Sequence, residues 1–218
     1  DYAGHRQSGG KRKYMIYMED ISAIVDDVLH HVQEFTRPHA NLPVFARGQS
    51  LGGIIAIMAA LRQPEAFQGL ALGAPPFELA GFVGKLARWG PAQRWHGIPA
   101  ASAYVKEHFA KLALPLAVFQ GVEDGTVSAV GARRLVHGVG SSDKALYLYQ
   151  NMGHNMSMEP DVLDWLLQRV AEKRTGATLY IRKPLPGVTW PPPPGDLAAS
   201  NNTQLQVVEL PDEQSRLL

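Results

Sequence analysis

The chain has 218 residues, with 21 lysines and arginines against 20 aspartates and glutamates, 8 histidines and no cysteine. Mixed charges without a basic cluster argue against a nucleic-acid partner, and the lack of cysteine excludes disulfides, thiol catalysis and zinc–thiolate sites. No apolar run approaches the roughly 18 residues that a membrane-spanning helix needs. Histidine and carboxylate side chains must therefore carry any polar chemistry, and we expect a cytoplasmic protein because cysteine-free chains fit a reducing compartment.

The first part of the chain alternates helical and strand-like patterns. Residues 20–36 carry apolar side chains at spacings of three and four, which predicts an amphipathic helix. The run 42–48 is apolar without alternation, as in a parallel strand covered on both faces. A helix at 51–62 follows, and a second apolar run lies at 69–75.

The same alternation returns in the second half of the chain. Apolar runs at 114–121 and 145–151 predict two further strands, and helical patterns lie near 129–137 and 160–174. Short strands separated by helices are typical of βαβ units. The sequence therefore predicts an α/β fold with a mostly parallel sheet flanked by helices.

Two segments break this alternation. Residues 76–113 are apolar, aromatic and basic, which predicts a short helical cap inserted over one end of the sheet. The stretch "KPLPGVTWPPPPGDLAASNN" is proline-rich and polar, as in polyproline or disordered linkers. We therefore predict a core domain at 1–178, which includes the cap, and a proline-rich, disordered tail at 179–218.

The stretch "GQSLG" sets a serine between two glycines where a predicted strand meets a predicted helix. A sharp turn there would hold Ser50 in a strained conformation, with Gly48 and Gly52 leaving room for neighbouring chain. The following helix would direct its amides at the reacting centre, with the Leu51 N–H as an oxyanion donor. G-x-S-x-G arises by chance in roughly one such sequence in ten. The alternative is a serine in a tight turn, but the flanking elements favour a nucleophile.

A serine nucleophile needs a base, and the base needs an orienting acid, in the chain order serine, acid, histidine. Asp124 follows the strand 114–121, with Glu123 as the alternative, and Gly125 suits the turn after Asp124. His154 lies in a loop directly after the last predicted strand, at the sheet edge where open α/β folds bind ligands. It is the strongest of the histidine candidates for the base.

Together these residues resemble the α/β-hydrolase family, and within it the monoacylglycerol lipases. The blocks "DYAGHRQSGG", "LPVFARGQSLGG", "VFQGVEDGTV" and "NMGHNM" occur in the same order as in that family, from residue 1 to about 175. The resemblance implies Ser50 as nucleophile, Asp124 as acid, His154 as base and the Leu51 amide as one oxyanion donor. It further implies hydrolysis of glycerol monoesters of long-chain fatty acids through an acyl-enzyme, with no metal or organic cofactor.

The chain departs from the family pattern at several points. The family usually has histidine where Gln49 stands and glycine where Arg6 stands, and the cap at 76–113 is shorter than in the animal enzyme. The resemblance sets Asp1 after the fourth strand of the family fold. Three earlier strands and the loop with the second oxyanion donor are therefore expected to be absent from this chain.

The predicted cap combines an apolar surface with basic residues. We expect this surface to collect a lipid from a membrane and to guide its acyl chain to the nucleophile, which makes the protein peripheral to membranes. The alternative is a lid packed on the core. The candidates for acyl-chain contact are Phe77, Leu79, Phe82, Leu86 and Trp89.

Three hypotheses follow from the sequence. The first is a serine hydrolase that cleaves monoacylglycerols to fatty acid and glycerol, although lysophospholipids or other long-chain carboxylic esters would use the same residues. The second is a catalytically impaired relative that binds a lipid or a protein through its cap and tail. The third is a partial copy of a longer, active enzyme. The sequence gives no basis for predicting the oligomeric state.

Overall fold

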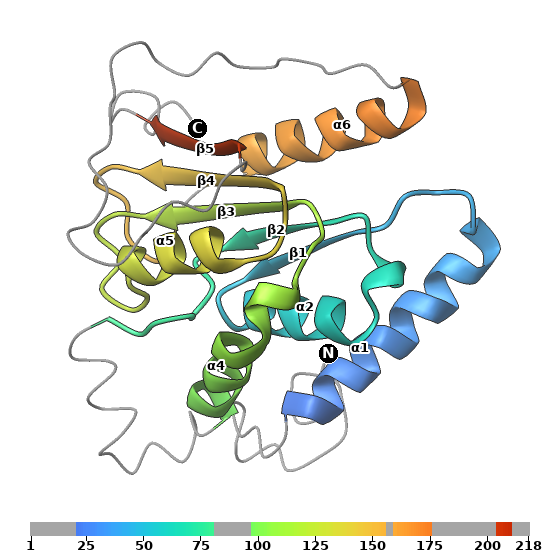
Figure 1. Cartoon of the computed structure of the whole chain (residues 1–218), viewed down its shortest axis with the longest axis horizontal. Coiled ribbons are helices and arrows are strands. Elements are labelled where there is room, and N and C mark those ends of the chain that lie inside the picture. The colour runs from blue at the N-terminus through green and yellow to red at the C-terminus, as the bar shows by residue number, and fades with distance from the viewer. Residues whose placement is uncertain (1–20, 81–96, 156–158, 176–203, 211–218) are drawn as a thin grey trace.

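The computed structural model describes residues 21–80, 97–155, 159–175 and 204–210. Within these ranges, five strands form one sheet in which every neighbouring pair is parallel. They lie side by side in chain order (Figure 1). Their bounds are β1 Phe45–Gln49, β2 Gly69–Gly73, β3 Leu116–Gly121, β4 Asp143–Tyr149 and β5 Gln204–Leu210. The predicted parallel α/β fold is confirmed.

Helices lie before and between the strands. The longer ones are α1 Ile21–Thr36, α2 Leu51–Arg62, α4 Gly97–His108, α5 Ala129–Gly138 and α6 Glu159–Thr175. Four of these, α1, α2, α5 and α6, match the segments where helical patterns predicted them. Short 3₁₀ turns occupy Arg37–His39, Pro64–Ala66 and Phe109–Lys111. Helix α4 and the last of these turns lie inside the predicted cap, whose residues 81–96 fall outside the described ranges.

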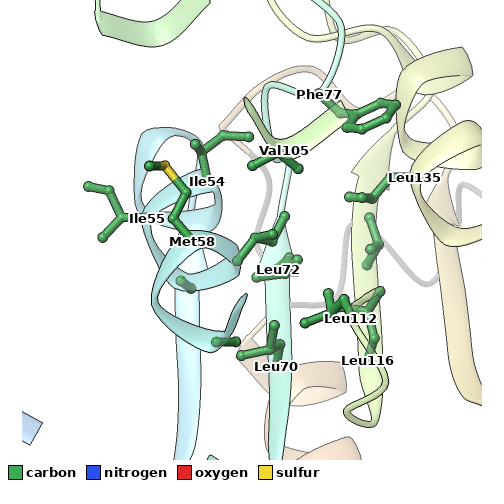
Figure 2. Close-up of a cluster of buried hydrophobic side chains, with 14 of the residues drawn as sticks. Ile54, Ile55, Met58, Leu70, Leu72, Phe77, Val105, Leu112, Leu116 and Leu135 are labelled. Atoms are coloured by element: carbon green, nitrogen blue, oxygen red, sulfur yellow. The ribbon is translucent and has the colours of Figure 1, made fainter. Parts of the chain in front are cut away.

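The two faces of the sheet are covered by different helices. Side chains alternate between faces along each strand, so that Leu70 and Leu72 join a cluster with α1, α2, α4 and α5. Ala71 and Phe119 face the other way, toward α6, where Trp165 meets Phe45 edge-on. Figure 2 shows side chains of α2, β2 and the start of β3 meeting in the first cluster.

Helix α2 is the central helix of the first cluster. Residues Gly53 to Ala60 are all buried, because α2 packs against β1 and β2 of the sheet and also against α1 and α4. A helix that is apolar all round is typical of such an interior position. The N-terminus of α2 is thereby fixed against the end of β1, where Ser50 lies.

The predicted disordered tail at 179–218 differs from the structure at one segment. Gln204–Leu210 forms β5, which pairs in parallel register with β4 from Asp143↔Gln204 to Tyr149↔Leu210. Its sequence "QLQVVEL" carries adjacent β-branched valines, which favour strand structure, and the proline-rich stretch ends before it. Residues 176–203 and 211–218 lie outside the described ranges, so that the domain boundary near residue 178 stays a prediction.

The start of β4 contains a buried lysine, Lys144, whose side chain reaches the C-terminal end of α5. Lys144 Nζ donates hydrogen bonds to the carbonyls of His137 at 3.1 Å and Val139 at 3.0 Å. A cation at a helix C-terminus is favourable, whereas burial lowers the pKa of Lys144. Burial, together with the nearby Lys144 cation, also lowers the pKa of His137.

No helix among the residues described is long and apolar enough to span a membrane.

The lowered pKa of His137 predicts a loss of stability in mild acid. Because the unfolded chain then binds more protons than the folded one, stability falls as pH drops below the ordinary histidine pKa of about 6.5. We expect His137→Gln to reduce this dependence. Urea unfolding at about pH 7.5 and about pH 5.5 measures it. The same slope in both proteins would contradict the assignment to His137.

Candidate active site

Three side chains predicted to carry chemistry meet at the carboxyl edge of the sheet. Ser50 directly follows β1, Asp124 lies in the loop after β3, and His154 lies in the loop after β4. Parallel strands present the loops that follow them at one edge, and ligands bind there in open α/β folds. The sheet thus brings together residues that are 104 positions apart in the chain.

The turn at Ser50 is sharp and strained. Ser50 has φ 50° and ψ −121°, a conformation that non-glycine residues rarely adopt. Its N–H donates to the carbonyl of Gly73 at 2.8 Å, and its carbonyl accepts from the Gly53 N–H at 2.8 Å. These bonds tie the β1–α2 turn to the end of β2 and to the first turn of α2, and they leave Ser50 partly exposed at the sheet edge.

The two glycines of the motif have different roles. A Cβ at Gly48 would lie 2.3 Å from the carbonyl oxygen of Gly52, so β1 and α2 approach too closely for any side chain there. A Cβ at Gly52 would have no neighbour within 4 Å. The predicted room for neighbouring chain is therefore needed at Gly48 and not at Gly52, whose backbone is the neighbour that Gly48 accommodates.

Ser50, His154 and Asp124 form a continuous hydrogen-bonded chain. The distance from Ser50 Oγ to His154 Nε2 is 3.0 Å, and that from His154 Nδ1 to Asp124 Oδ2 is 2.8 Å. An ionised carboxylate only accepts hydrogen bonds, so Nδ1 carries the ring proton and Nε2 accepts from the serine. This arrangement can remove a proton from the hydroxyl as it attacks an electrophile.

Asp124 is buried, and both of its oxygens are hydrogen-bonded. Oδ1 accepts from the backbone N–H groups of Thr126 at 2.8 Å and Val127 at 2.9 Å. Oδ2 accepts from His154 and from Gln120 Nε2, the latter at 3.1 Å. The Asp124 side chain has no exposed surface, whereas that of His154 is 23% exposed. The carboxylate is thus a fixed, desolvated partner for a ring that is partly exposed to solvent.

The alternative residues weighed from the sequence lie elsewhere. Glu123 is exposed, and its backbone N–H donates to the Met152 carbonyl at 3.0 Å. Among the other histidines within the described ranges, His137 lies at the end of α5, and His108 stacks on Tyr104 in α4. His30, His31 and His39 are exposed on α1 and the turn after it. His5 and His96 lie outside the residues described.

The loop that carries His154 is held against the ends of two strands. A Cβ at Gly121 would lie 2.4 Å from the Met152 carbonyl oxygen, so the loop packs directly on the end of β3. From the other side, Gln49 Nε2 donates to the His154 carbonyl at 3.2 Å. The residue next to the proposed nucleophile therefore contacts the backbone of the proposed base.

The predicted acyl-chain residues are only partly described. Phe77 is 3% exposed and belongs to the first cluster, where the centre of its ring lies 5.1 Å from that of Phe109. Leu79 pairs with Val127 in an antiparallel bridge next to the Asp124 loop. Phe82, Leu86 and Trp89 lie outside the described ranges, as does Arg6. The structure thus supports a packing role for Phe77.

The hydrogen bonds of Gln49 to the His154 carbonyl and of Gln120 to Asp124 were not predicted from the sequence. Gln120 had a detectable signal, since it is a lone amide in the otherwise apolar run "LAVFQG". A polar side chain in a buried strand needs a hydrogen-bond partner. Gln49 had no such signal, because its partner lies 105 positions away. In the parts of the chain described, no three acidic, histidine or cysteine side chains group as metal ligands.

A comparison with protein families matches the model of serine aminopeptidase, S33, at residues 1–100 and 89–161. These matches cover most of the chain, including Ser50, Asp124 and His154. The chain belongs to this hydrolase family. Its solved structural neighbours share the α/β-hydrolase fold. The monoacylglycerol lipase of Paleococcus ferrophilus has a TM-score of 0.62 at 16% identity, with 78% of this chain and 81% of that chain covered.

Curated relatives of this S33-family chain are esterases and lipases by name. It is 28% identical to human monoglyceride lipase, covering 81% of this chain and 75% of the relative. It is also 28% identical to caffeoylshikimate esterase of Arabidopsis thaliana, covering 74% of this chain and 63% of the relative. The chain therefore spans less than two thirds of the plant relative. A soluble variant of the Saccharomyces cerevisiae monoglyceride lipase, solved with a substrate analog, has a TM-score of 0.60 at 16% identity, with 77% of this chain and 75% of that chain covered.

The close approach at Gly48 predicts that the two motif glycines tolerate alanine differently. We expect Gly48→Ala to lower the free energy of unfolding by about 3 kcal/mol, because backbone must move to accommodate the methyl group. Gly52→Ala has open space and should cost little, since alanine favours helix. Chemical denaturation of both variants measures the difference. Equal losses would contradict this account of the turn.

The Gln49 contact predicts a change in turnover without a change in fold. Gln49→Ala should lower kcat for ester hydrolysis about tenfold, because the loop carrying His154 loses an anchor and small misplacements are costly. The matched control is Gln33→Ala, which removes an exposed amide hydrogen bond to Gln63 at the C-terminal end of α2, whereas Ser50 lies at its N-terminal end. Steady-state kinetics compare the two. Similar kcat values for Gln49→Ala and the control would exclude the anchoring role.

Proposed function

We propose that the chain is a serine carboxylesterase that hydrolyses monoacylglycerols to fatty acid and glycerol. The observation that supports this most strongly is the hydrogen-bonded chain from Ser50 Oγ through His154 to the buried Asp124, at 3.0 and 2.8 Å. A serine, a histidine and an acid in this arrangement are the components of acyl transfer. We assign them the roles of nucleophile, base and acid.

In the first half of the proposed reaction, Ser50 Oγ attacks the ester carbonyl while His154 Nε2 takes its proton. A tetrahedral intermediate forms, with negative charge on the former carbonyl oxygen. Asp124 keeps the Nδ1 proton in place and stabilises the imidazolium. When the intermediate collapses, the C–O bond to the alcohol breaks, and His154 returns the proton to the departing glycerol oxygen. The acyl group is left on Ser50.

The N-terminus of α2 supplies the proposed stabilisation of the oxyanion. Leu51 is the first residue of α2, and the first amides of a helix have no partner within it. The strained turn at Ser50 sets this amide next to the attacking oxygen, where the helix dipole also favours negative charge. One such donor contributes about 10²- to 10³-fold to the rate in serine hydrolases.

In the second half, water replaces the alcohol. His154 Nε2 takes a proton from the water as its oxygen attacks the acyl carbonyl. A second tetrahedral intermediate forms and collapses, and His154 returns the proton to Ser50 Oγ as the fatty acid leaves. Ser50, His154, Asp124 and the Leu51 amide serve both halves of the proposed reaction, so it requires no further group from the residues described.

The preference for monoacylglycerols is supported by the relatives rather than by the site. The human and mycobacterial relatives are named as monoglyceride or monoacylglycerol lipases, whereas the plant relative is named for a caffeoyl ester. The alternatives are therefore a lysophospholipase or another long-chain carboxylesterase acting through the same residues. Membrane contact through the cap stays a prediction, because residues 81–96 lie outside the described ranges.

Labelling with a fluorophosphonate probe tests the assembled site. We expect the wild-type chain to be labelled and Ser50→Ala to be unlabelled, because the nucleophile itself is removed. His154→Ala and Asp124→Asn should lower the labelling rate and ester turnover by about 10³-fold or more. Hydrolysis of monooleoylglycerol, lysophosphatidylcholine and a caffeoyl ester by the same protein then ranks the substrates.

Two outcomes would count against the proposal. Absence of labelling in a folded wild-type chain would favour a catalytically impaired relative that binds lipid or protein. If the chain is labelled but hydrolyses lysophosphatidylcholine or the caffeoyl ester faster than monooleoylglycerol, the proposed esterase activity stands. Monoacylglycerol is then the wrong substrate.

A further inference from the structure

A fully buried amide lies beneath the acid of the proposed site. Gln120 is on β3, and its residue is 0% exposed. Its Nε2 donates to Asp124 Oδ2 at 3.1 Å and to the Gly121 carbonyl at 3.0 Å. The other side chains of this strand are apolar, in keeping with its burial on both faces. An amide at this position therefore needs an explanation other than packing.

The orientation of the amide is fixed by the carboxylate that it faces. An ionised carboxylate only accepts hydrogen bonds, so the NH₂ end of Gln120 must point at Asp124. The opposite end, Oε1, is consequently buried without a hydrogen-bond partner. Such an unpaired acceptor is costly, and most buried polar atoms avoid it. The bond to Asp124 is retained despite this cost.

With Gln120 included, Asp124 has a complete set of donors. Thr126 and Val127 supply two backbone N–H groups to Oδ1, and Gln120 shares Oδ2 with His154. A carboxylate offers about four lone-pair sites, so these four donors saturate it. Each oxygen is held by at least one group that does not titrate. The position of Oδ2, to which His154 must donate, is thus set by Gln120.

We propose that Gln120 is a positioning residue that holds Oδ2 of Asp124 in line with His154 Nδ1. The proposal rests on the roles proposed for Asp124 and His154. Gln120 touches no reacting atom and acts through the carboxylate alone. Without its donor, Oδ2 has no fixed contact other than the ring that it must orient. The imidazole then samples orientations in which Nε2 no longer faces Ser50.

The test replaces Gln120 with a side chain of similar length that cannot donate. Gln120→Met removes both the bond to Oδ2 and the unpaired Oε1, so the fold should be retained. We expect the low-field proton resonance of His154 Nδ1–H, assigned by its loss in His154→Ala, to shift or broaden. Turnover of an ester substrate should fall about tenfold with KM unchanged.

A second variant restores the donor in a pH-dependent way. Gln120→Glu sets two carboxyl groups about 3 Å apart, and such pairs share a proton because both cannot ionise. The introduced carboxyl then donates to Asp124 at neutral pH and loses this ability in alkali. We expect Gln120→Glu to keep the Nδ1–H resonance at neutral pH and to lose it as pH rises. A purely structural role for Gln120 would not produce this switch.

The matched control is Lys144→Met, which removes a buried side chain with two backbone hydrogen bonds at the other end of the sheet. It should lower stability and leave the Nδ1–H resonance unchanged. An unchanged resonance in folded Gln120→Met or a pH-independent one in Gln120→Glu would overturn the positioning role. A wild-type protein with this resonance but no ester turnover would instead refute the proposed function, since the resonance needs no catalysis.

Discussion

The contact between Gly48 and the backbone of Gly52 sets the geometry of the whole site. A Cβ at Gly48 would approach the carbonyl oxygen of Gly52 to 2.3 Å, so the end of β1 and the first turn of α2 are nearly in backbone contact. Ser50 connects the two with a φ of 50°, a conformation that non-glycine residues rarely adopt. This turn exposes the hydroxyl and directs the start of α2 at the same point. The buried, all-apolar α2 holds the turn in place.

A second constraint brings the partners of Ser50 to it. The parallel sheet brings the loops after β1, β3 and β4 to one edge. The loop of His154 packs directly on Gly121, because the Met152 carbonyl occupies the space that a side chain at position 121 would need. Backbone donors hold one oxygen of Asp124, and Gln120 holds the other. The result is a site whose geometry depends on backbone contacts and two glutamines as well as on Ser50, Asp124 and His154.

Local patterns predicted most of the fold and the three side chains that meet in one hydrogen-bonded chain at the sheet edge. The helix at 20–36 is α1 to within a residue, because its apolar spacing matches the face buried against α2. The strand predicted at 42–48 begins later, at Phe45, since Leu42 is exposed and Pro43 has no N–H for pairing. β5 was not predicted because its strand-like sequence follows a long proline-rich stretch, and its pairing with β4 is a long-range contact. For the same reason, the contact of Gln49 with the loop of His154 could not be predicted from residues that lie 105 positions apart.

The central claim is that Ser50 carries the acyl group during turnover. Acid quenching of the protein during hydrolysis of monooleoylglycerol, followed by peptide mass spectrometry, tests it most directly. The account predicts an oleoyl adduct on the peptide that contains Ser50, formed in the wild-type chain and absent from Ser50→Ala. Turnover with no adduct on that peptide, or with an adduct on another residue that persists in Ser50→Ala, would contradict it.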